Sequence, residues 1–249
     1  MSVAEPDGVF VTGTDTEVGK TVIAGAIALL LRRAGRRVGV FKPVATGCRH
    51  DPRGDLVSAD AEFLAHCADS PADLPTINPV RYADALAPSV AARRAKRPVD
   101  FEAIDRAYRR IRQDRDVVVV EGIGGLMVPL DERTFVTDLA KRLRLPLVVV
   151  ARAGLGTINH TLLTLDAARR AGLDIAGVFL NHYRPSEATL AEETNPDEIA
   201  RCGNVDLPTV VPHDPAVHIA KGLLGDDLLF AVSQWGGLTR LTGGPTRRR

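Results

Sequence analysis

Short runs rich in valine and isoleucine alternate with stretches of helical spacing along most of the chain, and this alternation constrains the fold more than any other feature. Apolar β-branched runs predict strands, whereas apolar residues at three- and four-residue intervals predict helices. The expected strands cover residues 8–12, 38–41, 116–121, 145–151, 175–180 and 207–211. The expected helices cover residues 19–34, 58–66, 100–113, 157–171, 187–201 and 218–232. This alternation predicts right-handed crossovers, and therefore an α/β fold with a mainly parallel sheet and helices on both faces.

The domain organisation that we expect is simple. The run at 117–120 is apolar on both faces, as a central parallel strand covered on each side must be. Between residues 44 and 100 the pattern is weaker, and several prolines break it: Pro71, Pro75, Pro79 and Pro88. A length of 249 residues suits one large α/β domain, and no linker or repeat divides the chain. We expect one domain over residues 1–241 and a disordered tail at 242–249.

The composition argues against several classes of function. Lys and Arg total 32 against 31 Asp and Glu, so the net charge of +1 favours neither a nucleic-acid surface nor a polybasic membrane anchor. No apolar run approaches the roughly 20 residues of a membrane span, and the N-terminal MSVAEPDG lacks the regions of a secretory signal. Three distant cysteines, Cys48, Cys67 and Cys202, fit a reducing compartment. We expect a cytoplasmic, enzyme-like domain that binds neither nucleic acid nor membrane.

Polar residues that directly follow the expected strands should meet at one edge of the sheet. Ligands of parallel α/β sheets bind beyond the carboxyl ends of the strands. The segments that this rule selects are 12–21, 42–46, 121–125, 151–159 and Asn181. The candidate functional residues are therefore sought in these segments.

The segment Gly13–Thr21 lies between the first expected strand and the first expected helix, and it ends in Gly-Lys-Thr. Backbone N–H groups of such a loop bind phosphates, the lysine reaches the outer phosphates, and the threonine hydroxyl ligates Mg²⁺. Five residues separate Gly13 from Gly19 instead of the usual four, so the loop is a lengthened variant. The alternative is a glycine-rich turn with an exposed lysine. The order of strand, turn and helix favours a nucleoside triphosphate site.

Three further charged residues are candidates for the same site. Glu121 ends a strand beside a glycine turn, where its carboxylate could hold Mg²⁺ or only cap the turn. Lys42 follows the second strand and is one of only five lysines among the 32 basic residues. A second ammonium would stabilise charge on a transferring phosphoryl group, and the alternative is a solvated strand-end lysine. Chemistry alone leaves Asp60 open between a metal ligand and a solvated or capping residue of its helix.

Five segments resemble the dethiobiotin synthetase family in order and spacing. They are Val-Thr-Gly-Thr-Asp-Thr-Glu-Val-Gly-Lys-Thr at 11–21, Lys-Pro-Val-Ala-Thr-Gly at 42–47, Val-Glu-Gly-Ile-Gly-Gly at 120–125, Leu-Gly-Thr-Ile-Asn-His at 155–160 and Gly-Val-Phe-Leu-Asn at 177–181. The resemblance covers about residues 8–182. It implies a P-loop NTPase-like fold, usually homodimeric, that converts 7,8-diaminopelargonate, CO2 and ATP to dethiobiotin, ADP and phosphate in biotin synthesis. The implied intermediates are a carbamate and a carbamic–phosphoric mixed anhydride.

The resemblance also implies roles for individual residues. It makes Lys42, Lys20 and Thr16 catalytic. It assigns ATP binding to Glu17, Val18, Gly19, Lys20, Thr21, Val22, Asp60, Glu121, Gly122, Gly124, Asn181 and Pro212. Among these, Asn181 would contact the adenine. Mg²⁺ would be held by Thr21, Asp60 and Glu121. Thr46, Gly156 and Asn159 would bind the substrate, the last two by reaching its carboxylate across the dimer interface.

The resemblance weakens toward the C-terminus. Of the family's second nucleotide-contacting loop, expected at 207–214, little beyond Pro212 is matched, and residues 213–249 match poorly, so the contacts to the base stay open there. Four histidines, His160, His182, His213 and His218, lack metal-ligand spacing, and we interpret them as surface or packing residues.

Two rival functions use the same fold. An ATPase switch of the partition-protein type carries an extra lysine early in its phosphate loop, where this chain has Gly13, Thr14 and Asp15. An ATP-dependent amide-forming enzyme for a cobalamin precursor or a similar acid would need a glutamine-hydrolysing domain with a nucleophilic cysteine. None of the three cysteines has a suitable setting for that role. The sequence therefore favours an ATP- and Mg²⁺-dependent cyclo-ligase.

Overall fold

A computed structural model of the chain describes residues 7–243, whose main sheet has six strands. The strands are β1 (Asp7–Gly13), β2 (Val38–Phe41), β7 (Val117–Gly125), β8 (Leu147–Arg152), β9 (Ile175–Tyr183) and β10 (Thr209–Pro212). Their order is β10-β9-β8-β1-β7-β2, and every neighbouring pair is parallel. The α/β class expected from the sequence is confirmed. The four valines of β7 are fully buried between β1 and β2, as a central strand requires.

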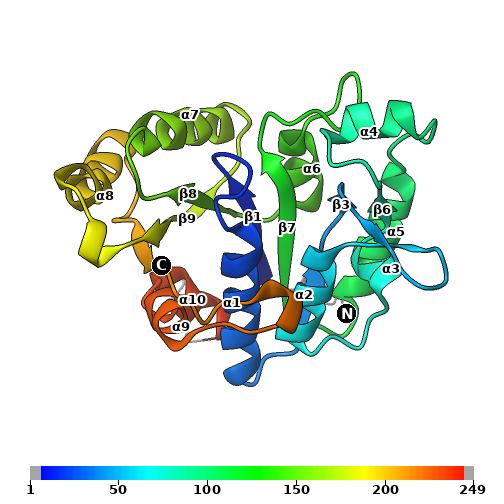
Figure 1. Cartoon of the computed structure of the whole chain (residues 1–249), viewed down its shortest axis with the longest axis horizontal. Helices are drawn as coiled ribbons and strands as arrows, with labels where there is room; N and C mark the ends of the chain where they lie inside the picture. The colour runs from blue at the N-terminus through cyan, green and yellow to red at the C-terminus, as the bar shows by residue number, and fades with distance from the viewer. Residues whose placement is uncertain (1–6, 244–249) are drawn as a thin grey trace, which may run out of the picture.

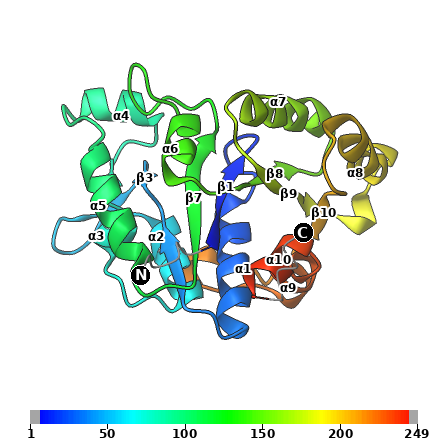
Figure 2. The ribbon, with the colours of Figure 1, turned by 180° about the vertical axis from the view of Figure 1, so that it is seen from behind.

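Helices cover both faces of this sheet because the crossovers run in two directions. The connection from β1 to β2 contains α1 (Lys20–Arg33), and it runs across the sheet in one direction. The later crossovers run the other way, and they contain α5 (Phe101–Arg112), α6 (Val136–Leu143), α7 (Thr157–Arg170) and α8 (Leu190–Gly203). Right-handed connections therefore put α1 on one face and these four helices on the other. Figure 1 shows α1 in front of β1, and Figure 2 shows the reverse side, with α5 and α6 beside β7.

The face that carries α1 is completed by three helices that contact it. They are α2 (Ala59–Ala68), α9 (Asp226–Ser233) and α10 (Gly236–Leu241). Within α1 the side chains of Ile23, Ile27 and Leu31 are fully buried, and their four-residue spacing forms one stripe toward the core. The first turn of α1, which carries Lys20 and Thr21, is thereby fixed at the carboxyl end of β1.

The weakly patterned part of the sequence folds into many small elements. They are β3 (Val44–Ala45), β4 (Arg49–His50), β5 (Leu56–Val57), α3 (Leu74–Ile77), β6 (Val80–Arg81) and α4 (Pro88–Arg94), in addition to α2. β3 pairs with β6 in parallel and β4 with β5 antiparallel. Two-residue strands leave no periodicity in a sequence. Pro75 and Pro88, which we interpreted as breaks, lie in the first turns of α3 and α4, where a missing N–H costs nothing.

Three parts of the helix prediction need correction. The expected helix at 218–232 is wrong in its first half, which forms the short 3₁₀ helix η2 (Ile219–Lys221) before α9 begins at Asp226. Gly222 has a left-handed backbone with φ of 68°, which ends η2. The helix α6 was not expected; it stops at Arg144, a non-glycine residue with φ of 54°, so the usual stop signal is missing. Likewise α8 follows a 3₁₀ turn, η1 (Pro185–Glu187), and starts at Leu190 instead of 187.

The expected tail is described only in part. Thr242 caps α10 and donates its N–H to the Leu238 carbonyl at 2.9 Å, and Gly243 follows it. Residues 244–249 lie outside the described residues. Within residues 7–243 no helix combines the length and the apolar character needed to cross a membrane.

Candidate functional site

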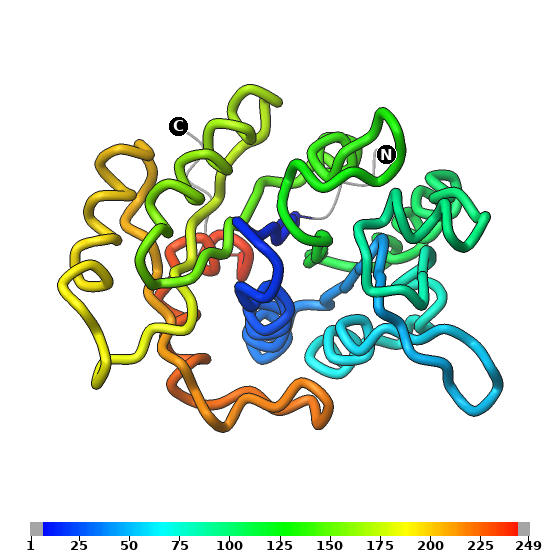
Figure 3. The backbone as a smooth tube through the Cα atoms, turned by 45° about the horizontal axis from the view of Figure 1, so that its top comes forward, coloured from blue at the N-terminus to red at the C-terminus, as the bar shows by residue number. Residues whose placement is uncertain are grey.

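The carboxyl ends of β1, β2 and β7 open into a cleft of about 410 Å³. Its lining comprises Thr16, Glu17, Gly19, Lys20, Thr21, Val22, Lys42, Ala45, Thr46, Asp60, Glu121, Ile123, Gly124, His182 and Ile219. In Figure 3 the loop before α1 is blue, α2 (cyan) lies beside α1, and the segment around η2 (orange) lies beside α2. The common edge predicted from the strand ends is therefore hollowed at the place where the charged candidates meet.

The loop between β1 and α1 is held from both sides. The Lys20 side chain is buried and donates to the Asp15 carbonyl at 3.0 Å, so it closes the loop on itself. From β9, the Asn181 side-chain amide donates to the Val18 carbonyl at 3.0 Å. Gly19 caps α1 with φ of 92°, and a Cβ at this position would overlap the Asn181 amide. Only glycine satisfies both the backbone conformation and the close approach.

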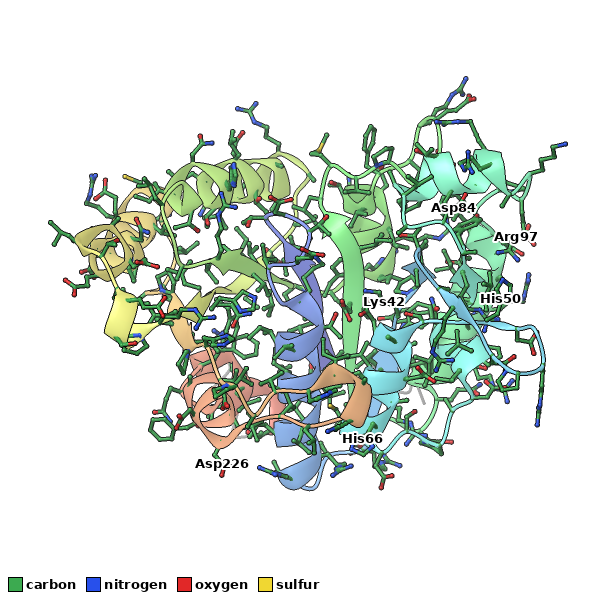
Figure 4. The ribbon with its side chains drawn as sticks, in the orientation of Figure 1. Lys42, His50, His66, Asp84, Arg97 and Asp226 are labelled. Atoms are coloured by element: carbon green, nitrogen blue, oxygen red, sulfur yellow. The ribbon has the colours of Figure 1, made fainter. Side chains whose placement is uncertain are left out.

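Lys42 binds two carboxylates that come from different elements. Its Nζ lies 2.7 Å from Glu121 Oε1 in β7 and 2.7 Å from Asp60 Oδ2 in α2. The same ammonium donates to the Gly122 carbonyl at 3.2 Å, and the Thr21 hydroxyl donates to Glu121 Oε1 at 2.8 Å. Lys42 and Glu121 are buried, whereas the Asp60 side chain is 37% exposed. Figure 4 shows Lys42 between β7 and α2.

Burial and pairing shift the pKa values of this cluster in opposite directions. Burial alone would lower the pKa of Lys42, but Glu121 and Asp60 together raise it above the usual value. Burial works to raise the pKa of Asp60, yet the adjacent Lys42 outweighs it and the pKa falls. Burial raises the pKa of Glu121, and Lys42 offsets only part of this effect. Lys42 is therefore held as an ammonium, with Asp60 as its ionised partner.

The phosphate-loop lysine has a different electrostatic setting. Burial lowers the pKa of Lys20, with Glu121 acting in the opposite direction and Lys42 adding to the decrease. The cleft therefore contains two lysine side chains near one buried carboxylate, Glu121. An anionic ligand would relieve both the burial and the mutual repulsion.

The backbone of Lys42 is fixed by a neighbour that the sequence did not indicate. The Lys42 N–H donates to the Ile77 carbonyl at 2.8 Å, and the buried Asn78 amide donates to the Lys42 carbonyl at 2.6 Å. Asn78 also donates to the Val80 carbonyl at 3.3 Å. Asn78 lies in the irregular region, far from any expected strand end, so the positional rule could not select it.

The oxygen atoms of the cleft fit a hard divalent cation. Glu121 Oε2 is buried and has no hydrogen-bond partner among the described residues, so this acceptor is available to a further ligand. Beside it lie the Asp60 carboxylate and the Thr21 hydroxyl. Residues 7–243 contain no cluster of three or more His, Cys, Asp or Glu side chains placed to hold a metal alone. Mg²⁺ is typically bound by few protein oxygens, and phosphate and water oxygens complete its coordination.

Not all residues expected at the site line the cleft. Thr16, Glu17, Gly19, Lys20, Thr21, Val22, Lys42, Thr46, Asp60, Glu121 and Gly124 do so. Val18, Gly122 and Asn181 support its wall from behind through the contacts given above. Pro212 lines a separate hollow between β10 and α9.

Gly156, the N-cap of α7, and Asn159, in its first turn, are exposed and lie apart from the cleft lining. Leu155 beside them is 83% exposed, and Met127 and Leu163 are 62% and 61% exposed. Met127 and Leu163 line a hollow of about 360 Å³, which also contains Thr16 of the cleft. An apolar surface therefore adjoins the cleft on the α7 side.

The structure also adds residues to the cleft that sequence reasoning missed. His182, which we interpreted as a surface or packing residue, forms part of its wall, together with Ile219. Ala45 and Ile123 also line the cleft, and they lie in the segments 42–46 and 121–125 that the strand-end rule selected. His182 follows Asn181 at the end of β9, so the strand-end rule could have selected it. Ile219 belongs to the segment that was wrongly expected to be helical, and no sequence signal placed it here.

Known proteins resemble this chain over most of its length. A family model described as an AAA domain matches residues 7–220. The relatives named ATP-dependent dethiobiotin synthetase BioD include one from Bacillus subtilis, 41% identical over 230 residues, which covers 90% of this chain and 97% of the relative. Another, from Anaeromyxobacter sp., is 42% identical over 221 residues and covers 89% of this chain and 96% of the relative. A third, from Thermodesulfovibrio yellowstonii, is 38% identical over 213 residues, with 83% and 88% covered.

Solved structures resemble the chain in fold. The MinC:MinD cell division protein complex of Aquifex aeolicus has a TM-score of 0.59 at 12% identity, with 98% of each chain covered. The septum site-determining protein MinD of Pyrococcus horikoshii, complexed with Mg-ADP, has a TM-score of 0.52 at 15% identity, with 95% of this chain and 93% of that chain covered. At such low identity this likeness concerns the fold alone.

Proposed function

The chain belongs to the ATP-dependent dethiobiotin synthetase family, as its motifs predict, and from this premise we propose that it closes 7,8-diaminopelargonate and CO2 into dethiobiotin at the expense of ATP. The chain is thus an ATP-dependent ligase, and the proposal concerns its substrates and mechanism. The observation that carries the proposal is the junction of Lys42, Asp60 and Glu121 beside the phosphate-loop residues Lys20 and Thr21. Such a junction gathers cations and metal-binding oxygens around a single anion.

The proposed reaction has three steps. One amine of the substrate adds CO2 and loses a proton, which gives a carbamate. A carbamate oxygen then takes the γ-phosphoryl group of ATP, which leaves ADP and a carbamic–phosphoric mixed anhydride. The second amine attacks the carbamate carbon, phosphate leaves, and the cyclic urea closes with loss of a proton. The first step creates an anion, and the second brings this carbamate to the anionic triphosphate, so the protein contributes mainly positioning and charge neutralisation.

The residues of the cleft take roles that suit these steps. Lys20 and Lys42 would neutralise the transferring phosphoryl group and the carbamate, because both ammonium groups line the same cleft. Thr16 would be a catalytic residue of the phosphate loop. The loop segment 17–19 and Val22 would hold the phosphates of ATP. Gly122 and Gly124, in the last residues of β7, would bind ATP through their backbone. Thr46, half-buried in the lining, would contact the diamine or its carbamate.

Mg²⁺ would be held by Thr21, Asp60 and Glu121. Support comes from the unpartnered Glu121 Oε2 and from a donor set that consists only of oxygen atoms. Bound there, the ion would supply charge neutralisation for the phosphates. Asn181 and Pro212 are proposed at the adenine end of the nucleotide. ATP is a cytoplasmic metabolite, so the cytoplasm is the proposed location.

The substrate-binding roles of Gly156 and Asn159 need a second copy of the chain. Both residues lie outside the cleft lining, in the first turn of α7. The exposed Leu155, Met127 and Leu163 on the same side supply an apolar surface that a second copy could bury. We therefore propose a homodimer in which α7 of one subunit reaches the substrate carboxylate in the other.

The test is release of ADP by the purified chain with ATP, Mg²⁺, bicarbonate and 7,8-diaminopelargonate, each omitted in turn. The proposal expects ADP and dethiobiotin in equal amounts only when all four are present. Equal ADP release without the diamine would indicate a plain ATPase instead.

A further inference from the structure

A second hollow, of about 280 Å³, lies between α4 and the hairpin at residues 129–135. Figures 1 and 2 both show α4 beside the loop that follows β7, and the Ser89 N–H donates to the Pro129 carbonyl at 3.2 Å. The hollow shares no lining residue with the cleft at the phosphate loop. Its volume is close to the lower limit of ligand pockets, roughly 300 Å³. We call it the α4 pocket.

The buried part of the α4 pocket is apolar except for one hydroxyl. Ala92, Val99 and Leu130 line it, and all three are buried. Ser89 is only 6% exposed and lines it too, but its side-chain hydroxyl has no hydrogen-bond partner among residues 7–243. Buried hydroxyl groups normally have a partner, because an unpaired one has lost its water without compensation. The Ser89 hydroxyl is therefore available to a ligand that enters the pocket.

Two walls of the α4 pocket carry opposite charges. The end of α4 and the residues that follow it contribute Arg93, Lys96 and Arg97, and the hairpin contributes Asp131 and Glu132. The side chains of Arg93, Lys96 and Glu132 have no hydrogen-bond or ion-pair partner within the described part of the chain. No ion pair between described residues joins the two walls, so charge of both signs is available to a ligand.

One residue of each wall is fixed by contacts within the protein. The Arg97 guanidinium lies over the Tyr82 ring, 5.1 Å from the ring centroid. The Asp131 carboxylate accepts from the Arg133 and Thr134 N–H groups at 2.8 and 2.7 Å. Burial acts to raise the pKa of Asp131, but these hydrogen bonds outweigh it and the pKa falls, so the group stays ionised at neutral pH. Walls that are ordered in advance lower the entropic cost of binding.

We propose that the α4 pocket binds a small zwitterion whose carboxylate and ammonium groups are separated by an apolar carbon chain. The carboxylate would pair with Arg93 and Lys96, and the ammonium with Asp131 and Glu132. The Ser89 hydroxyl, whose backbone contacts the hairpin, would accept from the same ammonium, and the chain would pack on the apolar lining. A ligand with one charge, or with both charges on one carbon, would leave a wall unpaired. This site is separate from the cleft and does not depend on the reaction proposed there.

Four six-carbon compounds test the charge pattern, because they differ only in their charged groups. 6-Aminohexanoate carries the two charges at opposite ends, 2-aminohexanoate carries both at one end, and hexanoate and hexylamine carry one each. NMR titration of the isotope-labelled full chain measures each affinity and shows which amides respond. We expect 6-aminohexanoate to bind about fivefold more tightly than each of the other three, with the largest shifts at residues 89–99 and 130–132.

Variants of each wall should remove the preference for one charged group. Arg93→Ala combined with Lys96→Ala should make 6-aminohexanoate bind no better than hexylamine. Glu132→Gln should reduce its advantage over hexanoate to about twofold, because one carboxylate of that wall remains. Ser89→Ala should weaken 6-aminohexanoate and leave hexanoate unchanged. Arg94→Ala is the matched control, since Arg94 lies in the same helix but pairs with a carboxylate outside the pocket, and it should keep the wild-type order of affinities.

Four results would overturn the proposal. No binding of any compound at millimolar concentration, or equal binding of all four, would show that the charged walls select nothing. Shifts confined to Lys42, Thr46 and their neighbours would place 6-aminohexanoate in the cleft instead. An unchanged order of affinities in the double variant would exclude the basic wall. The amide spectrum also reports whether each variant is folded, and a wild-type chain that releases no ADP would refute the ligase reaction without affecting this site.

Discussion

At the scale of single residues, the position of the Lys42 side chain is determined by contacts from three parts of the chain. Lys42 directly follows β2, and hydrogen bonds with Ile77 and Asn78 fix its backbone. Asp60 and Glu121 bind its ammonium group. A buried charge without partners would cost several kcal/mol. The partners therefore both stabilise the lysine and aim it at the phosphate loop.

Replacing Lys42 should lower turnover strongly, and it should also lower stability because Glu121 loses its buried partner. We expect Lys42→Ala and the better-packed Lys42→Met to lower kcat by on the order of 100-fold or more, because each removes a preorganised cation from the transferring phosphoryl group. Steady-state ADP release in the complete reaction mixture measures this effect. Lys141→Ala, which removes an exposed lysine of α6, is the control and should keep full activity. Normal turnover by a folded Lys42→Met variant would exclude Lys42 from the mechanism.

The sequence could identify some residues of the candidate site and not others, for a physical reason. Lys42 and Glu121 follow strands of one parallel sheet, so their meeting was predictable from strand order alone. Asp60 reaches them from α2, within a region of two-residue strands that leave no pattern, and chemistry alone could not decide its role. His182 directly follows Asn181, so the strand-end rule could have included it, but its left-handed backbone, unlike one at glycine, has no signature in the residue type.

At the scale of elements, the segment between β10 and α9 depends on one carboxylate. Asp214 is buried and accepts hydrogen bonds from the Ala216 and Leu228 N–H groups, so it closes the segment and caps α9. The apolar residues of α9 have a clear helical spacing, but they could not show that the helix begins only at Asp226. Glycines at 222 and 225 and this carboxylate decide the boundary through three-dimensional contacts.

Asp214→Ala should loosen this segment selectively. Loss of the cap leaves two N–H groups without their acceptor, which should lower the free energy of unfolding by about 1–2 kcal/mol. Hydrogen exchange followed by mass spectrometry should show faster exchange over residues 214–225 and unchanged exchange in α7. Asp214→Asn, which keeps one acceptor oxygen, should have a smaller effect. Equal exchange rates in wild type and Asp214→Ala would contradict the anchoring role.

The starts of β2 and β7 are joined by an ion pair that should respond to acid. The Asp116 carboxylate accepts from the Arg37 N–H at 2.9 Å and lies 2.7 Å from the Arg37 guanidinium. The side-chain and backbone hydrogen bonds from Arg37 lower the pKa of Asp116 to about 2. The pKa of an unfolded aspartate is about 3.9. The stabilisation is therefore complete above that value and is lost as the pH falls toward and below 2.

Asp116→Asn should accordingly lower the free energy of unfolding by about 1 kcal/mol at pH 7, a value reduced for solvent screening because the Arg37 side chain is 61% exposed. Urea unfolding at a series of pH values measures the difference between variant and wild type. The difference should shrink steadily between about pH 4 and pH 2. Asp114→Asn removes a charge from the same turn and leaves the pair intact, so it should show little change. A difference that is constant with pH would contradict a role for the ion pair.

At the scale of the whole molecule, one surface is left apolar beside the cleft. Several large apolar side chains stay exposed, and near the cleft they are Leu155 at the start of α7 and Met127 and Leu163, which line one hollow with Thr16. Contiguous exposed apolar side chains are typical of a surface that another protein covers. Gly156 and Asn159 lie in the same place, outside the cleft lining of their own chain. The proposed homodimer explains both observations.

Introducing charge at this surface should therefore separate subunits and remove activity together. We expect Leu155→Asp with Leu163→Asp to convert a dimer into a monomer in light scattering coupled to size-exclusion chromatography, since a buried unpaired charge opposes association. ADP release that depends on the diamine should be lost, whereas Mg-tripolyphosphate binding should persist, because the phosphate loop lies within one subunit. Phe230→Asp is the matched control for the oligomeric state, since Phe230 is 69% exposed on α9 and not on α7. A double variant that stays dimeric, or a fully active wild-type monomer, would require the substrate carboxylate to bind within a single chain.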